Sequence, residues 1–164
     1  MPLYKIPIVK DFYLYTMPAP RQEEDLLLFF KELKVFGVNH VVNLLDNKDI
    51  VELSLQDESL ITHSVGLNYS HFPIEDYSFP KDKFAFISLA QKLKKEVLAQ
   101  QIIAIHCRAG IGRSSLLAAA ILASFSFPKE ELFQHISKHR GCAVPDKQEQ
   151  ASQLLDLYKE LAAL

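Results

Sequence analysis

The sequence is poor in cysteine, in charge of one sign and in long apolar runs. Its 164 residues include only two cysteines, Cys107 and Cys142, too few for the disulfide scaffold of a small secreted domain. The 18 basic side chains nearly balance 20 acidic ones, so no charge excess indicates a nucleic-acid partner or an anionic membrane. The longest apolar run, residues 116–123, is far shorter than the roughly 20 residues that a membrane-spanning helix needs.

These absences favour a protein of the reducing cytosol. Residues 1–9 contain Pro2 and Pro7 and no apolar core or cleavage site, so we do not expect a signal peptide. With 49% hydrophobic and 23% charged residues, the composition is that of an ordinary globular domain. We therefore expect one cytoplasmic domain over residues 1–164, with no membrane or nucleic-acid partner. No sequence feature indicates an oligomeric state.

Short apolar segments alternate with amphipathic ones along the chain. The segment of residues 101–105 ends in four consecutive apolar residues, 102–105, as in a strand that is covered on both faces. The pattern predicts a single-domain α/β fold with three layers (α/β/α) and a central, mostly parallel sheet of four to five strands. We expect strands at residues 12–15, 40–45, 69–74 and 101–105, and helices at residues 21–36, 47–65 (one or two), 81–99, 113–126, 128–139 and 147–163.

Residues 106–114 lie between the last apolar strand and a buried helix, where ligands bind in open α/β sheets. Gly110 and Gly112 allow successive amide groups to converge on an anion. The guanidinium of Arg113 can hold two oxygens of a phosphate at once. These groups and the helix dipole favour the thiolate of Cys107, a nucleophile that needs no separate base and no metal or other cofactor.

A buried structural cysteine is the alternative for Cys107, because cysteine is among the most buried residue types. The surrounding residues favour the catalytic interpretation, since His106, Gly110, Gly112 and Ser114 all fit the same loop. We expect the phosphate to be bound by Arg108, Ala109, Gly110, Ile111, Gly112 and Arg113.

The segment of residues 106–115, His-Cys-Arg-Ala-Gly-Ile-Gly-Arg-Ser-Ser, resembles the signature loop of the protein tyrosine phosphatase superfamily. The short chain suggests the dual-specificity family, and Met17-Pro18, residues 33–37 and residues 73–76 are similar to its kinase-associated phosphatase type. The resemblance implies a phosphocysteine intermediate on Cys107 and stabilisation of the phosphoryl group by Arg113. It also implies that Ser114 assists departure of the thiolate and that His106 helps to set the ionisation of the thiol.

The leaving oxygen of a phosphate ester needs a proton, and the acidic loop of residues 75–80 can supply one. In the dual-specificity family an aspartate preceded by a proline stands about thirty residues before the cysteine, and Asp76, after Pro73, matches it. Pro80 matches the proline that closes the loop of the family. Glu75 is the rival proton donor.

Residues 140–150 resemble the segment that opens the last helix of the family, where a glutamine can position the hydrolytic water. Gln150 matches that glutamine, although a surface position is almost as well supported. Asp146 stands where the family more often has glutamate or glutamine, and we expect it to cap the helix. Arg108 is either a solvated charge or a contact for an acidic substrate.

Cys142 is expected to be a small buried residue, and the alternative is a redox partner of Cys107. The histidines outside the loop are read as structural or surface residues, because none has metal-ligand spacing that completes a motif; they include His63, His71, His135 and His139. No metal site is predicted.

The sequence therefore predicts a cysteine-dependent phosphatase whose substrate is a phosphorylated protein, with phosphotyrosine and also phosphoserine or phosphothreonine as targets. Lipid, sugar and RNA 5′ phosphates are the alternative substrates. A sulfurtransferase or a non-catalytic phosphate-binding module is less well supported, because Cys107, Arg113 and the acidic loop are all present.

Overall fold

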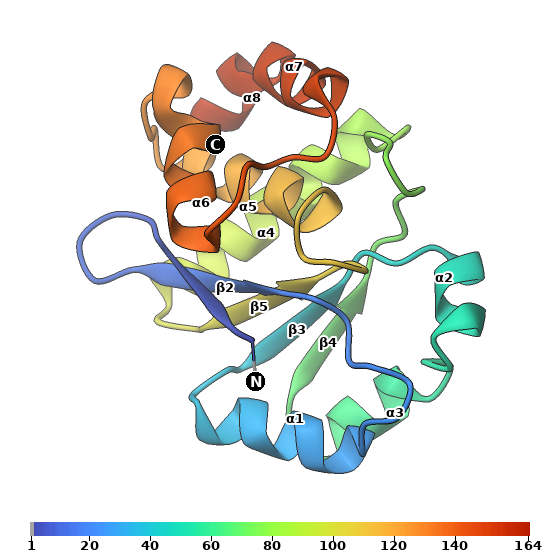
Figure 1. The fold of residues 1–164 in the computed structure, drawn as a ribbon. Helices are drawn as coiled ribbons and strands as arrows, with labels where there is room; N and C mark the ends of the chain where they lie inside the picture. The colour runs from blue at the N-terminus through green and yellow to red at the C-terminus, as the bar shows by residue number, and fades with distance from the viewer. Residues whose placement is uncertain (1) are drawn as a thin grey trace.

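The computed structural model describes residues 2–164. A sheet of five strands has the order β1-β2-β5-β3-β4 (Figure 1). β1 pairs antiparallel with β2, and the other neighbouring pairs are parallel, which confirms the prediction of a mostly parallel sheet. The strands are β1 (Tyr4–Pro7), β2 (Tyr13–Met17), β3 (His40–Asn43), β4 (Asn68–His71) and β5 (Ile103–His106).

Helices cover both faces of the sheet, so the predicted three-layer α/β fold is also confirmed (Figure 1). One face carries α4 (Lys83–Leu98), α5 (Arg113–Ser124), α6 (Leu132–Arg140), α7 (Gln148–Asp156) and α8 (Tyr158–Ala162). The other face carries α1 (Leu26–Val35) and α3 (Glu58–Ser64), with α2 (Asn47–Glu52) beside them.

The middle residues of the central strands are apolar because each face of the sheet packs against helices. Val42 and Ile105 belong to the core beneath α5, whereas Val41 and Ala104 point to the opposite core beneath α1. This alternation of side chains across a strand explains why residues 102–105 have no polar face.

Several element boundaries differ from the prediction. The first strand, β1, was not predicted, so the strand expected at residues 12–15 is the second one, β2. The helix predicted over residues 21–36 begins only at Leu26, because the Asp25 side chain accepts a hydrogen bond from Leu28 N and caps it there. The last predicted helix is divided at Leu157 into α7 and α8, and a short 3-10 turn, η1 (Lys129–Glu131), precedes α6.

The carboxyl ends of three parallel strands meet at one edge of the sheet. Met17 and Asn43, on either side, are both in register with His106. The loops that follow β5 and β4 start at this edge, where ligands bind in α/β folds. Among residues 2–164, no helix combines the length and the apolar character needed to cross a membrane.

Candidate active site

The loop of residues 107–112, here the Cys107 loop, joins β5 to α5. Gly110 has a φ of +72°, and a Cβ there would lie 2.7 Å from the carbonyl carbon of Met17. A Cβ on Gly112 would lie 2.1 Å from Asp146 Oδ2. Position 110 therefore requires glycine, both for its backbone conformation and for the close approach of the Met17 backbone, whereas a side chain at position 112 would displace the Asp146 carboxyl.

Contacts from two other segments hold the outer side of this loop. Arg140 donates from Nε to Gly110 O (2.8 Å) and from Nη2 to Ala109 O (3.0 Å). The guanidinium also stacks on Tyr4 of β1, 3.8 Å from the ring centroid, and Ala19 N donates to Arg108 O (3.1 Å). Because three successive carbonyls bond outward, the amides of the loop can face inward and form an anion site.

Cys107 lies at the base of the loop and is only 2% exposed. Its Sγ is 3.4 Å from the hydroxyl of Ser114 in the first turn of α5. The structure thus brings together the cysteine and the serine that the sequence predicted, at the N-terminus of a buried helix whose dipole favours negative charge.

The buried side chain of Arg113 reaches the same place and contacts acidic partners. Nη1 donates to Asp49 Oδ2 (2.6 Å) and to Ile74 O (2.9 Å). Nη2 lies 3.3 Å from Asp76 Oδ1 but makes no hydrogen bond within the described structure. Burial alone lowers the pKa of Arg113, but Asp49, Cys107 and Asp76 raise it overall, so the side chain remains a cation. One guanidinium edge is anchored, and the other is available for a ligand.

The side chain of Arg108 is 44% exposed and pairs with two acidic side chains of α2. Its Nη1 donates to Glu52 Oε2 (2.7 Å) and to Asp49 Oδ1 (3.0 Å), and these partners raise its pKa. Burial raises the pKa of Asp49, but the bonds from Arg113 and Arg108 lower it overall. Asp49 therefore bridges Arg108 and Arg113. Sequence analysis missed this role.

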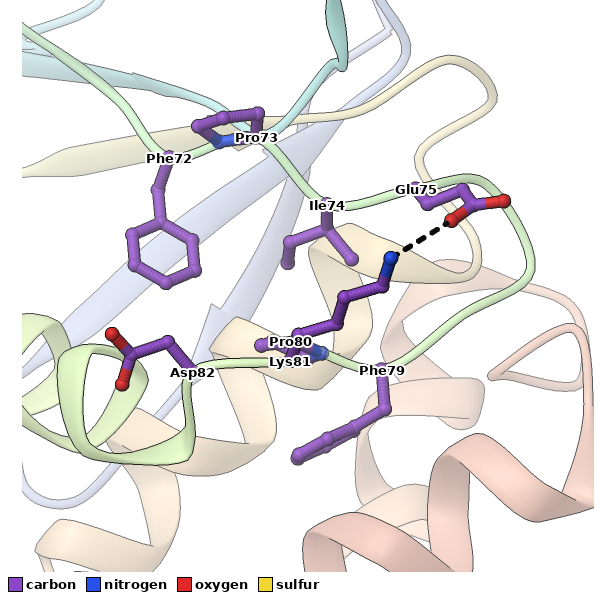
Figure 2. A pocket seen from close by; sticks show the side chains of 8 residues that line it. All are labelled: Phe72, Pro73, Ile74, Glu75, Phe79, Pro80, Lys81 and Asp82. Carbon is purple, nitrogen blue, oxygen red and sulfur yellow. Dashed lines mark ion pairs between the residues drawn. The ribbon is translucent and has the colours of Figure 1, made fainter.

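The loop of residues 75–80, here the acid loop, follows β4 and approaches the Cys107 loop from the opposite side. A cavity of about 320 Å³ lies between residues 72–75 and residues 79–82 (Figure 2). Glu75 points toward Lys81, with 3.9 Å between Oε2 and Nζ. Asp76 instead meets Arg113, and its side chain is 39% exposed. The two rival acids thus have different partners, and Asp76 is the one beside the arginine.

Gln150 and Asp146 bring the start of α7 to the site. Gln150 is buried, donates to Ser78 O of the acid loop (3.0 Å) and accepts from Lys147 N (3.0 Å). The expected N-cap role of Asp146 is wrong, because Lys147 occupies that position. The Asp146 carboxyl lies against Gly112 instead. Burial and the charge of Asp76 raise its pKa, although Arg113 and Lys147 oppose the shift.

Within residues 2–164, Cys142 forms no disulfide, and His71 and His135 bond backbone atoms away from the Cys107 loop. Cys142 is exposed and unpaired, so the expectation that it is buried was wrong. His71 and His135 each bond a backbone carbonyl, of Leu45 and Pro7 respectively. Within residues 2–164 no group of three or more His, Cys, Asp or Glu side chains is arranged to hold a metal ion.

Sequence analysis identified His106 as a supporting residue but missed its buried polar partners. His106 is completely buried and bonds Glu58 of α3, with 2.6 Å between Nε2 and Oε1. Asn43 of β3 donates to the other oxygen of Glu58 (2.7 Å). No local motif marks Glu58 or Asp49, since an acidic residue in the first turn of a helix is common; only the fold brings them to the loop.

Known proteins share both the sequence pattern and the fold. The family model described as polymorphic toxin system, DSP-PTPase phosphatase, matches residues 16–126. The chain is 27% identical over 140 residues to a probable protein tyrosine phosphatase type IVA A of Dictyostelium discoideum, covering 84% of this chain and 76% of the relative.

The similar solved structures include kinase associated phosphatase, with a TM-score of 0.88 at 19% identity, covering 99% of this chain and 96% of that one. PTPMT1 in complex with PI(5)P has a TM-score of 0.72 at 19% identity, with 92% of each chain covered. At this identity the likeness concerns the fold.

The segment that matches the family model makes up well over half of the chain and contains both the acid loop and the Cys107 loop. The chain therefore belongs to the dual-specificity branch of the protein tyrosine phosphatase superfamily, a family of cysteine-based phosphatases.

Proposed function

We propose that Cys107 attacks the phosphorus of a phosphate monoester and forms a phosphocysteine intermediate without a metal or another cofactor. The observation that supports this most directly is the position of Cys107 Sγ beside Ser114 in a loop whose carbonyls are bonded outward. As the sulfur–phosphorus bond forms, the bond to the ester oxygen breaks. Water then attacks the phosphorus and releases phosphate and the thiolate.

Arg113 and the inward amides of the Cys107 loop are proposed to hold the phosphoryl oxygens. The supporting feature is Nη2 of Arg113, a buried donor that makes no hydrogen bond in the described structure. Its other terminal nitrogen is fixed by Asp49 and Ile74, which preorganises the guanidinium for charge that develops in the transition state. Ser114 is proposed to donate its hydroxyl hydrogen to the departing thiolate in the second step.

Asp76 is proposed as the acid that gives its proton to the leaving oxygen. As a carboxylate it then accepts a proton from the attacking water. The contact with Arg113 supports this assignment, and the partnership of Glu75 with Lys81 argues against the rival. Gln150 is proposed to position the water, because its buried amide lies between the acid loop and Gly112.

The substrate is proposed to be a phosphorylated protein. Polyphosphorylated lipids or sugars would need further cations around the Cys107 loop, but the charge of Arg108 is neutralised by Asp49 and Glu52. The fold likeness to PTPMT1 keeps a lipid phosphate as the alternative. A panel of phosphotyrosine, phosphoserine and phosphothreonine peptides against PI(5)P decides between them, and exclusive turnover of the lipid would contradict the proposal.

The chemistry is tested by hydrolysis of p-nitrophenyl phosphate with EDTA and a reductant, comparing the wild type with Cys107→Ser. We expect activity that survives the chelator and is lost in the variant. Activity retained by Cys107→Ser would exclude Cys107 as the nucleophile, and loss of wild-type activity in EDTA would exclude a metal-independent reaction. Cys142→Ser is the matched control, because this exposed thiol lies outside the proposed machinery.

The two cysteines are unpaired in the structure, which supports our proposal that the protein acts in the reducing cytoplasm, where a nucleophilic thiol stays reduced.

A further inference from the structure

A carboxylate without solvent exposure lies directly behind the nucleophile. Glu58 in the first turn of α3 is 0% exposed, as is His106. The distances from His106 Nε2 to the two carboxylate oxygens are 2.6 and 3.1 Å. A charged group buried this deeply is costly unless it is paired. Glu58 and His106 each provide the buried partner that the other needs.

The hydrogen bonds around this pair determine where its protons lie. Asn43 Oδ1 accepts from Leu45 N (2.8 Å), which orients the amide so that Nδ2 donates to Glu58 Oε2 (2.7 Å). His106 Nδ1 lies 3.2 Å from the carbonyl oxygen of Cys107, and because a carbonyl can only accept, Nδ1 carries a hydrogen. Asn43 donates to one oxygen of Glu58, and the other oxygen lies 2.6 Å from His106 Nε2. With Nδ1 carrying a hydrogen, a second hydrogen on Nε2 makes the ring an imidazolium paired with the Glu58 carboxylate.

The charged and titratable groups around His106 come from three neighbouring elements. Glu58 faces it from α3, Tyr69 lies beside Asn43 on β4, and Arg113 approaches from α5. Burial alone lowers the pKa of His106, and Arg113 does the same, but the charge of Glu58 and its hydrogen bond raise the pKa overall. Burial and the charge of Glu58 also raise the pKa of Tyr69, which therefore stays a neutral phenol. Glu58 is thus the anion that keeps His106 charged.

We propose that Glu58 is a positioning residue that holds His106 as an imidazolium directly behind Cys107 and thereby favours the thiolate. The same imidazolium binds the Cys107 carbonyl and keeps it out of the phosphate site. This inference rests on the proposed function, since Glu58 acts through the nucleophile and does not touch the substrate.

The test measures how the alkylation rate of Cys107 by iodoacetamide depends on pH, in a Cys142→Ser background so that only one thiol reacts. Glu58→Gln keeps the size of the side chain and removes its charge. We expect the midpoint of the profile to move to higher pH by about one unit, with the acid limb of kcat/KM moving in the same direction. Glu58→Asp, which retains the charge, is expected to restore part of the shift.

Thr62→Val is the matched control on the same helix. Thr62 is also buried, but its hydroxyl bonds only the carbonyls of Glu58 and Ser59. We expect this variant to lower the melting temperature without moving the alkylation midpoint. A folded Glu58→Gln protein with an unchanged midpoint would overturn the proposal, whatever its loss of stability.

A second measurement needs no variant. Nitrogen-15 NMR of the wild-type protein is expected to show both ring nitrogens of His106 protonated at pH 7, and a neutral ring would overturn the proposal even if Glu58→Gln does not fold. Neither readout depends on turnover. A failure of the proposed function, seen as activity that survives Cys107→Ser, is therefore distinguishable from a failure of this inference.

Discussion

Asp49 is an ion-pair partner of both Arg108 and Arg113. Asp49→Asn leaves the buried guanidinium of Arg113 without its anionic anchor, and breaking such a pair typically costs about 3 kcal/mol. We expect a loss of that size in the free energy of unfolding at pH 7, measured by urea denaturation. Glu52→Gln is the control, because it removes only an exposed partner of Arg108 and should cost less than about 1 kcal/mol.

The pH dependence of this difference has a definite sign. The folded-state pKa of Asp49 is lowered, so its stabilising effect is complete above the unfolded-state value of about 4. It is lost as the pH falls through the folded-state value. The difference in unfolding free energy between wild type and Asp49→Asn should therefore shrink between pH 7 and pH 3, and a difference that is constant over this range would contradict the assignment.

The proton donor can be identified by the leaving group. Asp76→Asn should slow turnover of an alkyl phosphate by about 10²- to 10⁴-fold, and that of p-nitrophenyl phosphate much less, because nitrophenolate leaves without a proton. Glu75→Gln, which breaks only the contact with Lys81, should affect both substrates little. Steady-state rates with the two substrates make the comparison, and equal losses in Asp76→Asn would exclude the residue as the acid.

At the scale of elements, α6 supports the Cys107 loop from outside through Arg140. Arg140→Lys keeps the charge but cannot bond Gly110 O and Ala109 O with a planar fork. We expect kcat/KM for p-nitrophenyl phosphate to fall by about 10- to 100-fold, because small displacements of a catalytic loop are costly. Lys138→Gln, an exposed change on the same helix, should leave the rate unchanged. Wild-type kinetics in Arg140→Lys would mean that the loop holds its shape unaided.

Two residues before α7, the carboxyl of Asp146 lies against Gly112 in the loop that we propose to bind phosphate. The raised pKa of Asp146 keeps it neutral to higher pH than a free aspartate, and once ionised it repels a bound phosphate. KM of the wild type should therefore rise with pH, and Asp146→Asn should reduce that rise. Steady-state kinetics from pH 4 to pH 8 test this, with Glu149→Gln, at an exposed position in the first turn of α7, as the control. Parallel KM profiles would contradict the expected repulsion.

For the whole molecule, sequence periodicity was sufficient to predict the sheet and most helices, because each of them has an apolar side facing a core. The strand β1 was missed because it is short and ends at Pro7. The loop of residues 106–114 could be recognised from the sequence because its residues are contiguous. The supporting roles of three other residues could not be predicted, because their partners are distant in the chain: Asp49, Glu58 and Arg140.

The N-cap error at Asp146 has a related cause. The preference of aspartate for N-cap positions depends on neighbouring residues in the sequence. The Asp146 carboxyl instead lies beside Gly112, which is distant from it in the sequence. Gln150 could equally be placed on the surface from the sequence, and only the packing of α7 against Ser78 shows that it is buried.

An oxyanion that binds the proposed site should stabilise the fold, because it binds the folded protein and not the unfolded chain. At a concentration of 100 times the Kd, tungstate should add about 2.7 kcal/mol to the free energy of unfolding. This corresponds to roughly 5–10 °C in melting temperature for a domain of this size. Thermal unfolding with and without tungstate tests this, and Arg113→Lys should lose most of the shift. An equal shift in that variant would place the anion elsewhere.

The acidic partners of the loop arginines also bear on chemical inhibitors. Asp49 and Glu52 already bind Arg108, and Asp49 also binds Arg113, so Nη2 of Arg113 is the guanidinium donor left without a hydrogen bond in the described structure. A compact phosphate-like head group suits that single donor, whereas each additional phosphate or sulfonate would have to displace an internal carboxylate. Potency is therefore better sought from uncharged extensions along the acid loop, where Phe72, Ile74 and Phe79 line a cavity (Figure 2).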